Sequence, residues 1–486
     1  MFITFCLIAL YYKRQENIME LKRKIDNFLE EWKASSSHKP LTVMGIRQSG
    51  KTFSINRFAK SHYDNVFYLN FMTNPEAKED FLSSLDVNDL LPALSLRNPK
   101  ISFIPHKTVF FFDEIQDCPR ARLSLKSFAI DGRFDVIASG SYLGIKGYVV
   151  VDGTPLPVGY EDIYTMHTMD FEEFLWANGY GEEQIKLLRN AFDNKTPLSS
   201  TAMQVFSALY KQYLCVGGFP EAVSLFIDTR NLQTALNKVK SISIDLENDF
   251  GRRIGKDGKP LFKPEEVARI RSAYDLIPTF LGKENKRYIV SKVGTGKNAE
   301  QKKDAIAYLE DAGIIVRSFN VDSLSTPLSG GKRAGEFKIF PSDIGLLISM
   351  EEPGTVQGIL KGNLGIGKGA IFEGLVADAL FKNGSSLFYF ARTPNLEVDF
   401  VINVNGLATM LEVKSENGNA KSAKTILSNP SHYGKSRLFK IINGNISFEN
   451  GVFSFPHFLT FLIHNDDLSQ TAEDLSYNVI KEKLGF

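Results

Sequence analysis

The chain has 486 residues, of which 43% are apolar and 23% are charged, as in ordinary globular proteins. Its 57 basic and 56 acidic side chains give a formal net charge of +1, which excludes a strongly basic nucleic-acid coat. A disordered chain and a disulfide scaffold are also excluded, since the apolar content is high and the three cysteines lie far apart. We therefore expect a cytoplasmic protein of about three domains.

The first twelve residues are uncharged and mostly apolar. This stretch is too short to span a bilayer, which needs about 20 residues. Lys13 and Arg14 follow the apolar run, whereas a secretory signal carries its basic residues in front. We expect Met19 to be the true start and no integral membrane role, with a short membrane-proximal anchor as the alternative.

The first half of the sequence alternates between helical and apolar extended segments. A helix is predicted over 20–32, followed by strands at 41–44, 66–71, 108–112 and 134–138 with helical stretches between them. This alternation predicts a parallel α/β sheet. From 171 to about 249 the pattern is mostly helical, and the polar stretch 249–264 is typical of a linker.

The pattern in the second half of the sequence predicts two helices, a β-hairpin and a further α/β segment. Helices are expected at 264–282 and 303–311, and strands at 314–320 and 336–340 around a turn at 329–335. This order suits a winged helix. After the Gly-rich run 362–369, the pattern predicts a helix at 372–381 and strands at 387–390, 397–402 and 410–414.

Residues 45–52 read Gly-Ile-Arg-Gln-Ser-Gly-Lys-Thr and fit the phosphate-loop pattern G-x-x-x-x-G-K-[ST]. The glycines let successive backbone N–H groups turn toward phosphate oxygens. Lys51 would bind the β- and γ-phosphates and Thr52 would hold Mg²⁺, at the positive end of the following helix. The predicted nucleotide-binding residues are Gly45, Arg47, Gln48, Ser49, Gly50, Lys51 and Thr52, and the expected cofactors are ATP and Mg²⁺.

The strand 108–112 ends in Asp113 and Glu114, at the edge where α/β sheets bind ligands. Asp113 would hold Mg²⁺ and Glu114 would activate the attacking water. Ser139 and Ser141 follow the next strand and are candidates to contact the γ-phosphate or the water, with a Ser-rich turn as the alternative.

Arg120, Arg122 and Arg133 are candidate arginine fingers because we expect them near the carboxyl edge of the sheet. Each is more simply interpreted as a solvated surface arginine.

Together these motifs resemble a family of AAA-like P-loop ATPases of bacteria and archaea. Further matching segments are 112–116, 137–144, 170–175 and 216–223. Members join the ATPase to a helical extension, a winged helix and a C-terminal domain of unknown function with a nuclease-like fold. The resemblance implies five parts: an N-terminal extension and helix (1–38), the AAA-like core (39–170), the helical extension and linker (171–260), a winged-helix-like domain (261–362) and a nuclease-like domain (363–486).

The last part resembles the PD-(D/E)XK arrangement, in which an Asp on one strand and a Glu-x-Lys on the next bind Mg²⁺ and activate water. The matching residues are Asp399, Glu412 and Lys414, with Glu373 on the preceding helix. Strand alternation places Glu412 and Lys414 on one face. Gly374 stands where relatives carry a polar amide. The alternative is a vestigial fold whose acids make hydrogen bonds or salt bridges.

The function predicted from these features is Mg²⁺-dependent ATP hydrolysis that drives a conformational change in the C-terminal half. DNA is one candidate target, because lysines 292, 297, 302, 303 and 332 and Arg333 could contact a phosphate backbone; a solvated lysine face is the alternative. Two further functions stay open, a nucleotide-gated DNA-binding or protein-docking module and an ATP-regulated nuclease, and so does the oligomeric state.

Overall fold

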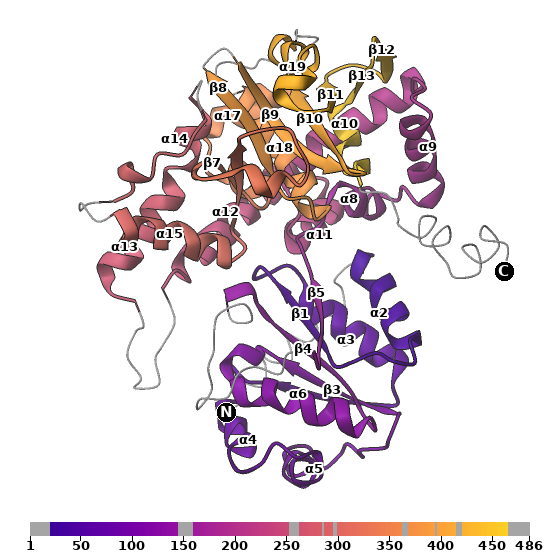
Figure 1. Ribbon diagram of the computed structural model, residues 1–486. Helices are drawn as coiled ribbons and strands as arrows, with labels where there is room; N and C mark the ends of the chain where they lie inside the picture. Colours follow the sequence, from indigo (N-terminus) through magenta and orange to yellow (C-terminus); the bar gives the residue numbers. More distant parts are fainter. Residues whose placement is uncertain are drawn as a thin grey trace, which may run out of the picture.

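The computed structural model describes residues 20–143, 159–251, 262–283, 286–294, 299–361, 368–393, 396–414 and 420–464. The expectations for residues 1–18 and for most of the linker lie outside these ranges. Figure 1 shows two lobes, a lower one with the first sheet and an upper one with the second, and α8 and α11 face the lower lobe. Among the described residues, no helix combines the length and the apolar character needed to cross a membrane.

The first sheet is parallel and has five strands in the order β2-β3-β4-β1-β5. The strands are β1 (Leu41–Gly45), β2 (Asn65–Asn70), β3 (Thr108–Asp113), β4 (Asp135–Ser141) and β5 (Asp162–Thr165). The predicted parallel α/β sheet is confirmed, with β5 as an additional strand. Because all five strands run the same way, their carboxyl ends share one edge.

Helices cover both faces of this sheet. They are α2 (Lys24–Ala34), α3 (Lys51–His62), α4 (Asp80–Ser83), α5 (Val87–Arg97) and α6 (Pro119–Asp131). Each face of the sheet has its own hydrophobic core, and β3 contributes to both. Val109 and Phe111 pack with α2 and α3 on one face, while Phe110 and Phe112 pack with α4, α5 and α6 on the other. A strand buried on both faces reads as an unbroken apolar run, as the sequence of β3 does.

The chain then forms a series of helices before and around the second sheet. They are α8 (Phe171–Ala177), α9 (Glu182–Asp193), α10 (Ser200–Val216), α11 (Pro220–Thr229), α12 (Leu232–Asn248), α13 (Pro264–Asp275), α14 (Ile277–Leu281), α15 (Ala299–Asp311), α16 (Ile344–Ser349), α17 (Pro353–Leu360), α18 (Lys368–Lys382), α19 (Lys421–Leu427) and α20 (Pro430–Tyr433). Short 3-10 helices are η1 (Pro75–Glu79), η2 (Ile115–Asp117), η3 (Val290–Lys292), η4 (Leu328–Gly331) and η5 (His457–Leu462). Asp170 begins α8 with a capping box, because its carboxylate accepts from Glu173 N while Glu173 accepts from Asp170 N.

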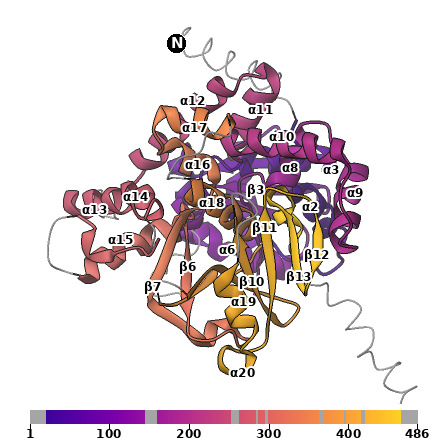
Figure 2. The ribbon, with the colours of Figure 1, turned by 90° about the horizontal axis from the view of Figure 1, so that it is seen from above.

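The second sheet is mixed and has eight strands in the order β12-β13-β11-β10-β9-β8-β6-β7. The strands are β6 (Ile315–Val321), β7 (Lys332–Pro341), β8 (Phe388–Thr393), β9 (Leu396–Val404), β10 (Leu407–Val413), β11 (Ser436–Ile442), β12 (Ser447–Glu449) and β13 (Val452–Pro456). Figures 1 and 2 place α13, α14 and α15 at the β7 edge and α9 at the β12 edge.

The hairpin expected for a winged helix is β6 and β7, and it belongs to this second sheet. Strand β6 pairs in parallel with β8 at Phe319–Phe388 and Asn320–Tyr389. The Asn320 amide adds to the pairing, since Nδ2 donates to Ala391 O at 3.1 Å and Oδ1 accepts from Ala391 N at 3.0 Å. The boundary expected near residue 362 therefore runs between neighbouring strands of one sheet.

A buried lysine anchors the segment that leaves the first sheet to the helices of the upper lobe. The Lys382 ammonium lies 2.7 Å from Asp378 Oδ1 and 3.0 Å from Asp343 Oδ2, and all three side chains are at most 1% exposed. It also donates to the Tyr213 hydroxyl and to the Met169 carbonyl, both at 3.0 Å. Met169 belongs to the segment after β5, Tyr213 to α10, and Lys382 to α18. Asp343 precedes α16, so one ammonium binds three segments outside its own helix.

The same junction explains the paired glycines of the 216–223 motif. Asp343 Oδ2 accepts from Thr168 Oγ1 at 2.6 Å and from Gly218 N at 3.0 Å. A Cβ on Gly218 would lie 2.0 Å from Met169 O and 2.9 Å from Lys382 Nζ. A side chain at residue 218 would therefore push the segment after β5 away from the turn between α10 and α11.

We predict that Lys382→Met destabilises the protein by about 3–5 kcal/mol, because it leaves two buried carboxylates without their shared cation. The free energy of unfolding in urea measures the effect. Lys424→Met, on the exposed surface of α19, is the control and should change stability by about 0.5 kcal/mol or less. Equal stability of the two variants would show that the junction does not depend on Lys382.

Candidate active site

The loop between β1 and α3 lies at the carboxyl edge of the first sheet. Gly50 has φ +93° and precedes the first residue of α3, and Gln48 has φ +62°. A Cβ on Gly45 would lie 2.2 Å from Met166 O, so only glycine fits there. The two glycines of the motif are thus required by the backbone, one by close approach and one by its left-handed conformation.

Lys51 is 9% exposed and folds back onto this loop. Its Nζ donates to Gly45 O at 3.0 Å and to Ile46 O at 2.9 Å. Burial lowers the pKa of Lys51 to about 8, although the carboxylates of Glu114 and Asp113 raise it. Among the described residues the acceptors of this ammonium are two neutral carbonyls, so an anion at the loop would be a stronger partner.

Asp113, at the end of β3, is 3% exposed and accepts hydrogen bonds from two neighbouring strands, β2 and β4, and from α3. Its carboxylate accepts from Thr52 Oγ1 at 3.1 Å and from Ser139 Oγ. Tyr68 OH donates to it at 2.9 Å and Asn70 Nδ2 at 3.0 Å. Because β4 lies between β1 and β3, Ser139 sits between the loop strand and the acidic strand.

Of these donors, the sequence indicated Thr52 and Ser139 but not Tyr68 or Asn70. Asn70 is the last residue of β2 and stands in register with Asp113. Polar residues at the end of a predicted strand were a usable signal, since parallel neighbours end at one edge.

Glu114 follows Asp113 in a left-handed conformation, with φ +52°. Such a backbone costs a non-glycine residue about 1 kcal/mol or more and concentrates at functional sites. Its N–H donates to Asp113 Oδ1 at 3.1 Å, and its carboxylate accepts from the Gln116 amide. The two neighbouring acids therefore have different environments: Asp113 is surrounded by hydrogen-bond donors, whereas Glu114 is half-buried.

The structure also places Ser141 and the candidate fingers. Ser141 is half-buried at the end of β4, in register with Gly45. Arg120 donates to the carbonyls of Phe81 and Leu82.

The other two arginines require corrections. Arg122 is buried and pairs with Glu161 at 2.7 Å, so it is no solvated surface arginine. Arg133 precedes β4 and binds Asp131, so it lies at the amino end of that strand and not at the carboxyl edge.

Helices of the upper lobe contact the loop. Arg47 Nε lies 2.8 Å from Asp249 Oδ2, directly after α12. Gln48 Nε2 donates to Asp245 Oδ2 at 3.5 Å. A Cβ on Gly50 would lie 3.4 Å from Pro220 Cγ, at the start of α11. Two side chains of the predicted binding loop are thus bound to α12.

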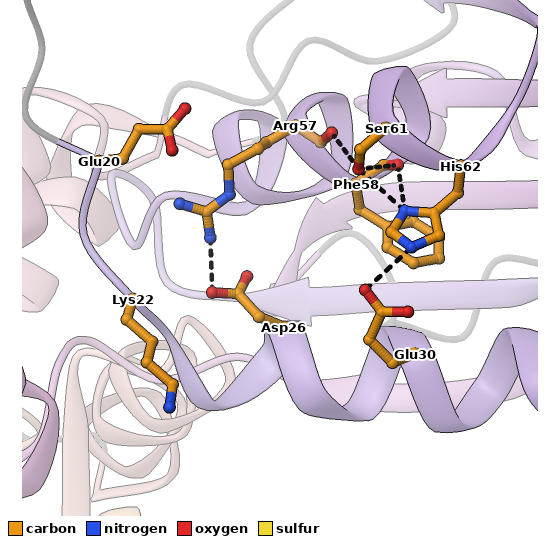
Figure 3. Close-up of a pocket in the computed structure, with 8 residues that line it drawn as sticks. All are labelled: Glu20, Lys22, Asp26, Glu30, Arg57, Phe58, Ser61 and His62. Atoms are coloured by element: carbon orange, nitrogen blue, oxygen red, sulfur yellow. Dashed lines mark hydrogen bonds and ion pairs between the residues drawn. The ribbon is translucent and has the colours of Figure 1, made fainter. Parts of the chain in front are cut away.

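A surface hollow of about 320 Å³ between α2 and α3 is separate from this edge. It is lined by Glu20, Lys22, Asp26, Glu30, Arg57, Phe58, Ser61 and His62 (Figure 3). Within it Arg57 pairs with Asp26 at 2.5 Å and His62 Nε2 lies 3.0 Å from Glu30 Oε1, whereas Lys22 lies 3.8 Å from Glu182 outside the lining. The hollow lies along the later turns of α3, whereas the loop precedes its first turn, and its acids do not suit a phosphate.

The predicted second site is brought together on β9, β10 and α18. Lys414 Nζ lies 2.7 Å from Glu412 Oε2 and 3.9 Å from Asp399 Oδ2, and Asp399 Oδ2 accepts from Val413 N at 2.8 Å. Glu373 is 3% exposed, and burial raises its pKa with a further contribution from Asp399. Burial and Asp399 raise the pKa of Glu412 to about 7, although Lys414 lowers it.

Two lysines that sequence reasoning missed bind these acids. Lys286 forms an ion pair with Glu373, and Lys338 Nζ lies 3.7 Å from Glu373 Oε2 and 2.8 Å from Glu397 Oε1. No group of three or more His, Cys, Asp or Glu residues within the described part of the chain is arranged to hold a metal ion. Gly374 has a packing role instead, since a Cβ there would lie 2.5 Å from Leu347 Cδ2.

The basic stretch expected to face DNA is only partly exposed. Lys302 is buried and donates to Ser291 O at 2.7 Å, a correction to its expected role, and Lys297 lies outside the described residues. Arg333 pairs with Asp322 at 2.7 Å, and Lys332 lies over the Phe319 ring. The exposed lysines of this stretch include 292 and 303.

Comparison with solved structures gives low overall similarity. A Walker-type ATPase of Pyrococcus abyssi is 12% identical, with a TM-score of 0.39 over 68% of this chain and 96% of that one. The ORC1 protein of Aeropyrum pernix, solved in complex with DNA, is 11% identical, with a TM-score of 0.29 over 70% and 95%. RuvB of Thermotoga maritima is 15% identical, with a TM-score of 0.26 over 63% and 89%.

Among curated proteins, none matches this chain. Three family models do match, each over part of it. Residues 37–175 match an AAA domain, residues 207–357 a domain of unknown function (DUF8612) and residues 368–457 another domain of unknown function (DUF4143). The first of these contains the loop, Asp113, Glu114 and both serines. The chain therefore carries an AAA-type P-loop ATPase domain followed by two domains of unknown function.

Proposed function

We propose that this protein hydrolyses ATP with Mg²⁺ at the edge formed by β1, β3 and β4. The observation that carries the proposal is the hydrogen bond of 3.1 Å between Thr52 Oγ1 and Asp113 Oδ2, which joins the loop to the acidic strand. A hydroxyl and a carboxylate at this distance are the oxygen donors that Mg²⁺ prefers.

The loop also has features that fit a nucleotide. The hydroxyl of Ser49 is buried and has no hydrogen-bond partner among the described residues. A Cβ on Gly45 would lie 3.2 Å from this hydroxyl, so the glycine leaves room beside it, and Lys51 supplies a buried cation. These features support phosphate binding by loop N–H groups and Lys51.

In this proposal, Thr52 and Asp113 would hold Mg²⁺, which would supply positive charge to the nucleotide phosphates. Glu114 orients the attacking water and accepts its proton. Lys51 stabilises negative charge that develops on the transferred phosphoryl group. Ser139 keeps the Asp113 carboxylate in place, and Ser141 stands beside Gly45 where a γ-phosphate or water contact is available.

Hydrolysis would act on the upper lobe through α12. The Arg47–Asp249 ion pair is partly exposed, with 37% and 23% of the side chains accessible. A pair of this kind contributes about 1 kcal/mol or less. Phosphate oxygens at the loop would be competitive partners for Arg47 and Gln48, so a bound nucleotide would release α12 from the loop.

Such a movement has two candidate targets, DNA and a protein partner. The exposed lysines 292 and 303 support a DNA contact weakly, because Lys302 and Arg333 are already engaged within the chain. A protein-docking role for the hairpin and the helices beside it remains the alternative.

A nuclease function is the less supported alternative. Glu373, Asp399, Glu412 and Lys414 do lie together, as a PD-(D/E)XK-like site would require. However, Lys286 and Lys338 both pair with Glu373, and Lys414 pairs with Glu412 and Asp399, so each acid already has a cation beside it. We propose that the cluster is a structural salt-bridge network.

Glu114→Gln should retain ATP binding and lose about 10²- to 10⁴-fold in turnover, because the amide cannot accept the proton of the water. Steady-state phosphate release with Mg²⁺, with and without duplex DNA, measures this. Glu79 is an exposed acid on the surface of the same lobe, so Glu79→Gln is the control and should leave turnover unchanged. ATP binding without turnover in the parent would instead favour a nucleotide switch that awaits a partner.

The affinity for ATP should fall as pH rises above about 8. In the free protein Lys51 loses its proton near that pH, whereas bound phosphates need the ammonium, so binding takes up a proton. The dissociation constant should therefore rise by at most about tenfold per pH unit between about pH 8 and 10. Lys51→Met removes the titrating group and should bind weakly with little pH dependence; an equal slope in the variant would refute the assignment.

Incubation of supercoiled plasmid with the protein and Mg²⁺ or Mn²⁺ should give no cleavage that depends on Asp399, since lysines hold the acid cluster. Cleavage present in the parent and lost in Asp399→Ala would contradict the structural role. Cleavage that persists equally in both proteins would come from a contaminating nuclease.

A further inference from the structure

Arg23 is a buried arginine that lies outside the segment 37–175 matched by the AAA domain model. It is the residue before α2 and is 4% exposed. A buried guanidinium is costly unless its donors are satisfied and its charge is paired. The hydrogen bonds and the ion pair of Arg23 therefore indicate the structural role of this side chain.

The three nitrogens of the guanidinium bind three different segments. Nη1 donates to Ser49 O at 2.8 Å, Nη2 donates to His167 O at 2.8 Å and Nε donates to Glu173 Oε1 at 3.0 Å. Ser49 belongs to the phosphate loop, His167 to the segment after β5 and Glu173 to α8. The planar fork of arginine can hold all three at fixed angles, which a lysine ammonium on a flexible stem cannot do.

The hydrogen bond from Arg23 to Ser49 O also orients the Gly50 N–H, which lies on the opposite side of the Ser49–Gly50 peptide. The Ser49–Gly50 peptide is planar and trans, so the Ser49 carbonyl and the Gly50 N–H point in opposite directions. Arg23 holds the carbonyl from behind the loop and thereby turns the Gly50 N–H away from itself. Nη1 lies 3.3 Å from the position of a Cβ on Gly50, which shows how closely the guanidinium supports this peptide.

Glu173 keeps the guanidinium in this orientation and balances its charge. Its Oε1 accepts from Arg23 and also from Lys24 N at 2.6 Å, and its Oε2 accepts from Asp170 N at 3.2 Å. The ion pair is buried on both sides, with 5% of each side chain exposed. Because this charge is already paired, Arg23 acts on the loop mainly through geometry.

We propose that Arg23 is a positioning residue for the phosphate loop, which aims the Gly50 N–H at the nucleotide phosphates without touching them. This role rests on the proposed ATP chemistry. It extends the working site to the segment before α2, and it connects the loop to α8 and to the segment that carries Thr168 and Met169.

The test compares Arg23→Met with Arg57→Met in the full chain. Arg57 also holds the N-terminal segment, since it donates to Leu21 O at 3.1 Å and pairs with Asp26, and within the described part of the chain it makes no hydrogen bond or ion pair with the loop. Isothermal titration with Mg²⁺ and ADP, steady-state kinetics with ATP and the melting temperature are measured for each protein.

Arg23→Met should weaken nucleotide binding about tenfold to a hundredfold, the loss expected for a charge-assisted hydrogen bond. KM should rise more than kcat falls, because the Gly50 N–H binds phosphate in the ground state as well as in the transition state. Arg23→Lys, which keeps the charge but not the fork, should also be weakened. Arg57→Met should lower the melting temperature without changing affinity.

Two results would overturn the positioning role while ATP chemistry stands: unchanged affinity in Arg23→Met and Arg23→Lys, or an equal loss of affinity in Arg57→Met, which would indicate a general effect of N-terminal docking. If Arg23→Met does not fold, the comparison of Arg23→Lys with Arg57→Met decides. A parent protein that binds no nucleotide would refute the proposed function itself, and the positioning role with it.

Discussion

The Lys382 ammonium, buried between Asp343 and Asp378, is the interaction on which the arrangement of the two lobes depends. Burial of a carboxylate is so unfavourable that the pKa of Asp378 is raised to about 6 despite the neighbouring cation. Such a cluster is stable only when every member is present, because removal of one leaves buried charge without a partner. The glycine at residue 218 shows the same constraint in the backbone, since a side chain there would reach Lys382.

From this junction, contacts continue to both candidate sites. Thr168 and Met169 bind Asp343 and Lys382, and the carbonyl of the neighbouring residue, His167, binds Arg23 behind the phosphate loop. On the other side, α18 carries Asp378 and Lys382 and also Glu373 of the acid cluster. The contacts form a continuous chain from the loop to the second sheet, with each step a hydrogen bond or a shared helix.

The two connections between the lobes differ in strength. The junction at Lys382 is fully buried, whereas the Arg47–Asp249 pair is partly exposed and contributes about 1 kcal/mol or less. In the proposed function, a nucleotide at the loop would therefore break the second contact and leave the first intact. We infer that α12 would move relative to the loop while the junction stays closed, which makes the junction the fixed point of any coupled motion.

Much of the first lobe could be predicted from sequence because its signals are local. The apolar run of β3 and the loop motif each specify an element within a few residues, and Asp113 and Thr52 meet because parallel strands end at one edge. Strand β5 was missed since it has only four residues and is exposed or half-exposed along its length.

The parts that could not be predicted depend on distant contacts. The parallel pairing of β6 with β8 joins segments about 70 residues apart, and no local pattern specifies it. Lys286 and Lys338 come from a segment before α15 and from β7, so their approach to Glu373 follows only from the completed sheet. The acids alone indicated a metal site, and the two lysines that pair with Glu373 are the reason that we propose a structural role instead.

Amide hydrogen exchange, with and without Mg²⁺ and ATP in the Glu114→Gln protein, tests the coupling most directly. If the loop exchanges its contact with α12 for the nucleotide, the last turn of α12 around Asp245 and Asp249 should exchange faster in the bound state. The loop itself and the segment at Thr168 and Met169 should become equally or better protected. Faster exchange at Thr168 and Met169 with an unchanged α12 would contradict the central claim that α12 moves around a closed junction.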